Sequence, residues 1–122
     1  MNADSARDWV MQRLDLRPTP VRAGQYVHVS QRAMHDPSVV GHRREGEGEP
    51  FTGWEIVSTR EAPGSASFGY YTVEELAAQH PEWMAALHLP PGWSFRFAGH
   101  TLVDAVSPQG TTHTLKLAVD LP

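Results

Sequence analysis

The sequence contains no cysteine, and this absence removes several kinds of chemistry at once. Disulfides, thiol nucleophiles, cysteine-based zinc sites and iron–sulfur clusters all need a cysteine sulfur. A chain without disulfides also suits a reducing compartment. We therefore predict a cytoplasmic protein.

Long apolar runs and an excess of positive charge are missing as well. Residues 1–17 are charged throughout and lack the apolar core of a signal peptide. No apolar run approaches the roughly 20 residues that span a bilayer, so no membrane partner is expected. The formal net charge is −4 at pH 7, and no basic patch emerges that would neutralise phosphates. We predict no nucleic-acid partner.

What the sequence does contain is typical of one folded domain. Its 122 residues are 40% hydrophobic and 20% charged, which is normal for a globular chain. A chain of this length buries enough surface to fold without a disulfide or a metal. We predict a single domain over residues 1–122.

Two regions carry helix patterns. An amphipathic helix is predicted over residues 5–17, where Ser5 and Asp8 have capping-box spacing. Thr72–Gln79 begins with a second capping box, and Pro81 suits the first turn of another short helix. We expect these last two to form a helical pair at the centre of the chain.

Alternating apolar and polar residues predict the strands. The expected strands are 25–30, 38–44, 53–58, 93–97, 101–106 and 113–119. The second is expected to run antiparallel to the first, and the last two to form a hairpin across residues 107–110. A loop is expected over 62–67. Because no βαβ rhythm is present, we predict an α+β fold: an antiparallel sheet with an N-terminal helix and a central helical pair packed on it.

Motifs for catalysis are missing from this pattern. The serines lack a GxSxG elbow, and the glycines at 46–48 lack the Lys-Ser/Thr of a P-loop. His28 and His42 are expected to face each other across the first two strands, but no histidine pair has metal-ligand spacing. We predict no catalytic residue, no metal and no cofactor. A small enzyme or ligand-binding protein that uses His28, His42 or the acidic loop 45–50 is the alternative.

Arg43, Glu45, Trp54 and Glu61 surround the third expected strand and are the candidate binding residues. In one interpretation Trp54 is core and the charges form surface ion pairs, each worth about 0–1 kcal/mol. In the other, a tryptophan and an arginine ringed by acids form a recognition surface, since these residue types dominate binding hot spots. The residues alone favour the first interpretation.

Several stretches, taken in order, resemble one bacterial family. They are Val29-Ser30, Val40–Glu45, Gly53–Ser58 followed by Glu61, and Leu87–Phe95. Together they resemble the immunity-protein-33-type domain, which is linked to immunity against polymorphic toxins, over about residues 26–97. The chain departs from the family pattern at Phe51-Thr52, where Asp-Ser is usual, and at Val57–Thr59, where a glycine-containing turn is common.

The resemblance implies a small cytoplasmic protein that binds and blocks a cognate toxin without turnover of its own. Arg43, Glu45, Trp54 and Glu61 would then serve recognition or support it structurally. The acidic balance suits a basic effector such as a nuclease, through electrostatic steering. A housekeeping or scaffold domain that neutralises no toxin stays open as the alternative.

Overall fold

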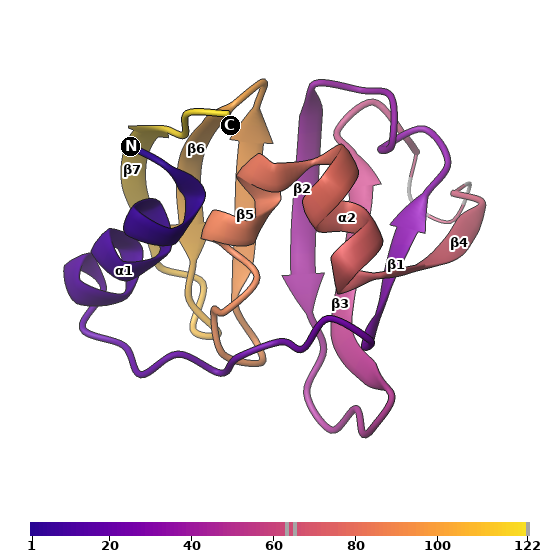
Figure 1. Ribbon diagram of the computed structural model, residues 1–122, viewed down its shortest axis with the longest axis horizontal. Coiled ribbons are helices and arrows are strands. Elements are labelled where there is room, and N and C mark those ends of the chain that lie inside the picture. Colours follow the sequence, from indigo (N-terminus) through magenta and orange to yellow (C-terminus); the bar gives the residue numbers. More distant parts are fainter. Residues whose placement is uncertain (63, 65, 122) are drawn as a thin grey trace.

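A seven-stranded sheet forms the body of the protein in the computed structural model, which describes residues 1–62, 64 and 66–121 (Figure 1). The strands lie in the order β4-β1-β3-β2-β5-β6-β7. They are β1 (Tyr26–Ser30), β2 (Ser38–Arg43), β3 (Phe51–Ser58), β4 (Phe68–Thr72), β5 (Ser94–Ala98), β6 (Thr101–Val106) and β7 (Thr112–Ala118). Every neighbouring pair is antiparallel except β1 and β3, which run parallel. The fold is α+β, with a mostly antiparallel sheet.

The helices all lie over the same face of this sheet (Figure 1). They are α1 (Ala3–Arg13), α2 (Val73–Gln79) and a 3₁₀ helix, η1 (Pro81–Ala85). Along β3 the side chains that point towards the helices are buried, whereas those that point away are half-buried or exposed. The protein therefore has one covered sheet face and one open sheet face. Within the described residues, no helix has the length and apolar character that a bilayer crossing demands.

Of the two capping boxes predicted at helix N-termini, one is confirmed and the other is wrong. Thr72 accepts a hydrogen bond from the backbone N–H of Glu75, whose side chain bonds back, so the predicted capping box is confirmed. The first helix begins earlier than predicted, because Asn2 caps it by accepting from the backbone N–H of Ser5. Pro81 does open the next helical turn, but that turn is 3₁₀. The central pair is thus one α-helix and one 3₁₀ helix.

The strand order corrects the predicted neighbours of β1. The first two strands do not pair, because β3 lies between them. His28 on β1 and His42 on β2 are therefore both neighbours of Glu55 on β3 instead of facing each other. β4 was not predicted as a strand. Pro63 and Ser65, within the expected loop 62–67, lie outside the described residues.

One continuous hydrophobic core fills the space between the covered face and the helices. Its largest fully buried side chains are those of the tryptophans at 54 and 83 and the phenylalanines at 95 and 97, each no more than 2% exposed. The strict alternation of β5 placed its two phenylalanines correctly. The predicted C-terminal hairpin of β6 and β7 is also confirmed. Since the core uses only one sheet face, the other is available for function.

Candidate partner-binding face

Arg43 is a buried cation at the end of β2, on the covered face. Only 5% of the residue is exposed. Its guanidinium donates to backbone carbonyls of Thr19 at 2.8 Å, Thr52 at 2.9 Å, Leu89 at 2.9 Å and Leu87 at 3.3 Å. Burial lowers the pKa of Arg43, but the carbonyl oxygens replace the water that a guanidinium loses. Arg43 thus ties two chain segments outside the sheet, one at Thr19 and one at Leu87–Leu89, to strands β2 and β3.

Trp54, on β3, lies beside Arg43 and also holds the Leu87 segment against the sheet. Its indole Nε1–H donates to the carbonyl of Leu87 at 2.8 Å. The guanidinium carbon of Arg43 lies 5.8 Å from the centre of the tryptophan ring, and Phe95 packs against the ring at 5.0 Å. The two residues predicted as binding candidates on β2 and β3 do meet, inside the protein. There they fix the segment that follows η1.

Glu45 and Glu61 lie at opposite ends of β3. Glu45 is exposed in the loop before the strand, with its carboxylate against the turn at Gly92. Glu61 follows the strand's other end, and a strand from Phe51 to Ser58 spans about 23 Å. The four candidates therefore divide into a buried pair and two separated carboxylates, and do not form one continuous surface.

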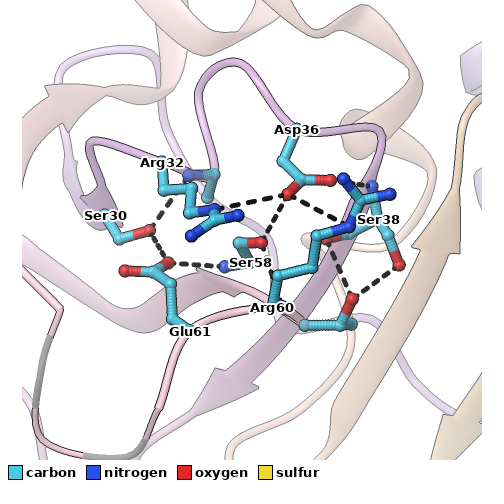
Figure 2. Close-up of polar contacts among 9 residues, drawn as sticks. Ser30, Arg32, Asp36, Ser38, Ser58, Arg60 and Glu61 are labelled. Carbon is cyan, nitrogen blue, oxygen red and sulfur yellow. Dashed lines mark hydrogen bonds and ion pairs between the residues drawn. The ribbon is translucent and has the colours of Figure 1, made fainter.

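Glu61 belongs to a network that locks the ends of the parallel strands together (Figure 2). Its carboxylate accepts from the hydroxyl of Ser30, at the end of β1, and from the backbone N–H of Ser58 at 2.8 Å, at the end of β3. The hydroxyl of Ser58 in turn donates to Asp36 at 2.7 Å. This hydrogen bond first, then the backbone N–H of Ser38 and the nearby Arg60 and Arg32, lower the pKa of Asp36.

Five ring side chains form an aromatic cluster on the open face. They are Tyr26 and His28 on β1, Phe51 on β3, and Phe68 and Tyr70 on β4. The ring of His28 is central: it lies 4.4 Å from Tyr70, 5.9 Å from Phe51 and 6.5 Å from Phe68, centroid to centroid. The other four are unusually exposed for their size, from 37% for Tyr26 and Phe51 to 61% for Tyr70.

The rest of the open face has a different character. Towards β7 it carries the ion pair of Arg96 with Asp104 and the hydrogen bond, 2.7 Å long, between His42 Nδ1 and the hydroxyl of Ser94. Cross-strand contacts of this kind satisfy one another and leave little apolar area. Exposed aromatic area is thus concentrated at the β4 end of the sheet.

Sequence reasoning missed this cluster because it missed β4. A signal was present: Phe68-Gly-Tyr-Tyr71 is a short aromatic run of the kind that favours strands. Phe51 also preceded the predicted start of β3 and therefore had no assigned face.

As for metal ligands, no group of three or more His, Asp or Glu side chains within the described residues is arranged to hold an ion.

The comparisons with known proteins give one family. The model of the Imm33-like domain matches residues 6–107, a longer stretch than the predicted 26–97, which takes in most of α1 at one end and β6 at the other. No curated protein and no solved structure gives a significant match. Because the matched region covers most of the sequence, the chain belongs to the Imm33-like domain family.

Proposed function

We propose that this protein is a non-catalytic, cytoplasmic immunity protein that binds a bacterial toxin and neutralises it. Membership of the Imm33-like domain family supports a protein partner. The aromatic cluster is the observation that carries the proposal. Four large rings are 37–61% exposed on one sheet face, and contiguous exposed aromatic area of this kind marks interaction sites on soluble proteins.

The energetics suit a binding face. A buried aromatic side chain removes about 150–250 Å² from water, so covering the half that is still exposed on each ring gains on the order of 2 kcal/mol per ring. Tyrosine and phenylalanine rings also lose little conformational freedom when they are covered, since each has only two side-chain torsions. The cluster can therefore supply the centre of an interface.

The four residues singled out from the sequence take two roles in this proposal. Arg43 and Trp54 support recognition from inside, because they hold the segment after η1 against the sheet. Glu45 and Glu61 are accessible to different degrees and contribute at the rim: Glu45 lies in the β2–β3 loop, and Glu61 lines the same hollow as Phe68. Binding by these carboxylates is secondary to the aromatic cluster.

The test pairs the protein with the toxin encoded beside its own gene. Wild type is expected to protect co-expressing cells and to bind the purified toxin in calorimetry. The double variant Phe68→Ala/Tyr70→Ala removes two exposed rings and is expected to weaken binding at least about 30-fold, equivalent to 2 kcal/mol. Leu121→Ala is the matched control, since Leu121 is exposed to a similar degree, 46%, and lies outside the cluster.

Two results would contradict the proposal. A wild-type protein that neither binds nor protects would remove the immunity function. Full affinity in the double variant, with melting temperatures matching wild type, would remove the aromatic cluster as the binding face.

A further inference from the structure

The aromatic cluster is bordered by two hollows that share a carboxylate. The first hollow lies between the cluster and the β2–β3 loop and is lined by Tyr26, Phe51, Glu47 and Glu55, among others. The second lies beside Phe68 and is lined by Glu55, Val57 and Glu61. Glu55 therefore stands at the point where both hollows meet the aromatic rings.

Negative charge dominates this border. The described residues that line the two hollows include three carboxylates, those of Glu47, Glu55 and Glu61, against one guanidinium, that of Arg44. Arg44 lies 2.7 Å from Glu55 but is 60% exposed, so it can swing away at little cost. Glu47 is exposed and forms no ion pair within the described part of the chain.

A ring nitrogen without a partner lies at the centre of the cluster. The Nε2 atom of His28 is buried and has no hydrogen-bond partner among the described residues. A buried polar atom in this state carries a cost that an incoming hydrogen-bond partner would relieve. His28 also lines the first hollow, so its ring borders the place where a partner's side chain would lie.

We infer that the aromatic cluster and Glu55 bind an arginine or lysine side chain presented by a basic protein partner. The positive group packs over the ring faces, whose quadrupole attracts cations, and pairs with Glu55 and Glu47 at the edge. An arginine also brings N–H donors close to the His28 ring, whose Nε2 accepts in the tautomer that is protonated at Nδ1. This inference rests on the proposed function and adds the chemistry of the partner.

A second copy of the chain fits the same face less well. Symmetric self-association would set Glu47, Glu55 and Glu61 of one copy near the same carboxylates of the other. Like charges brought together at an interface cost several kcal/mol and suppress the wrong partner. The charge distribution therefore selects a basic partner over a homodimer.

A small matched probe tests the inference without any toxin. N-acetyl-arginine amide and N-acetyl-citrulline amide differ only in the side-chain head group, which is a charged guanidinium in the first and a neutral urea of nearly the same shape in the second. In an NMR titration, the arginine probe is expected to shift the ring signals of Tyr26, Phe51 and Tyr70 in a saturable way. The citrulline probe is expected to bind at least about threefold more weakly, the factor that one exposed cation–π contact supplies.

Charge variants locate the site. Glu55→Gln and Glu47→Gln are each expected to weaken the arginine probe about threefold. Glu74→Gln, which removes an exposed carboxylate from α2 on the other side of the sheet, is expected to leave binding unchanged. Tyr70→Ala is expected to abolish the ring shifts.

Three outcomes would overturn the inference: equal binding of the citrulline probe, equal weakening by Glu74→Gln, or sedimentation showing a dimer that Tyr70→Ala disrupts. Protection of co-expressing cells against the toxin is measured separately and does not depend on any of these three outcomes. Failure of the cation site and failure of the immunity function are thus told apart.

Discussion

Replacement of Arg43 by methionine tests the interpretation of the buried arginine as a structural tie. Methionine keeps most of the side-chain volume but donates nothing, so the carbonyls of Thr19, Thr52, Leu87 and Leu89 lose the guanidinium. Three of these hydrogen bonds are 2.9 Å or shorter. Bonds from a charged donor contribute about 1.5–3 kcal/mol each, which gives a gross loss of roughly 5–9 kcal/mol.

Part of that loss is recovered, because the variant no longer buries a charge. Desolvation of a buried ion costs several kcal/mol, and the carbonyl of Leu87 keeps its bond from Trp54. We therefore expect a net loss of about 3 kcal/mol in the free energy of unfolding. For a chain of this length, that corresponds to a melting temperature lower by about 12 °C.

The assay is urea or thermal denaturation followed by circular dichroism, with Arg96→Met as the control. Arg96 is an exposed arginine whose side chain forms an ion pair with Asp104, so its loss should cost less than about 1 kcal/mol. Arg43→Lys should fall between the two, because an ammonium cannot reach carbonyls on several segments at once. If Arg43→Met unfolded within 1 kcal/mol of the Arg96 control, the structural reasoning would be refuted.

Two further predictions concern stability. Burial first, and then the positive charges of Arg7 and Arg43, lower the pKa of His88 below its usual 6.5. The unfolded chain therefore binds this proton more readily than the folded protein does. The contribution of His88 to the free energy of unfolding is thus full above pH 6.5 and falls as the pH drops towards the folded-state pKa. Urea midpoints measured from pH 8 to pH 5 should show this decline in wild type, and a flatter profile in His88→Gln; identical profiles would contradict it. Thr72→Ala removes the side chain that caps α2 and should cost about 1 kcal/mol; Thr112→Ala, at an exposed edge position on β7, is the control and should cost much less.

Local patterns were enough to predict the elements whose stabilising contacts are themselves local. The capping box at Thr72 and Glu75 needs only residues three apart, and the hairpin of β6 and β7 needs only a short turn. The alternation of β5 likewise reports directly which side chains face the core. In each case the signal and the contact occupy the same stretch of chain.

The strand order depended on contacts that no local pattern encodes. β1 pairs with β3 in parallel, and this places Glu55 between His28 and His42. A sequence pattern gives the period of a strand but not its neighbour. The first prediction for these histidines was wrong for that reason.

The candidate site divided along the same line. Arg43 and Trp54 were found as a pair, but their hydrogen bonds reach carbonyls on distant segments, as in the 2.9 Å contact of Arg43 with Leu89. The sequence therefore could not distinguish a buried structural role from an exposed binding role. The aromatic cluster draws on three strands, of which β1 and β3 were predicted, although Phe51 lay before the predicted start of β3. The cluster becomes visible only when β4 is placed beside β1. Which face stays open is a property of the whole sheet.

The position of β1 constrains how this sheet is assembled. It is the first strand in the chain, yet both of its neighbours, β3 and β4, come later, beyond Pro50 and Ser67 respectively. Every ladder bond it makes closes a long loop, whereas β5, β6 and β7 follow one another as a meander that needs only short closures. During synthesis β1 therefore waits for its first neighbour until β3 (Phe51–Ser58) has emerged, and for its second until β4 (Phe68–Thr72) has emerged. The half of the sheet that carries the exposed rings therefore forms by pairing strands that lie far apart in the sequence.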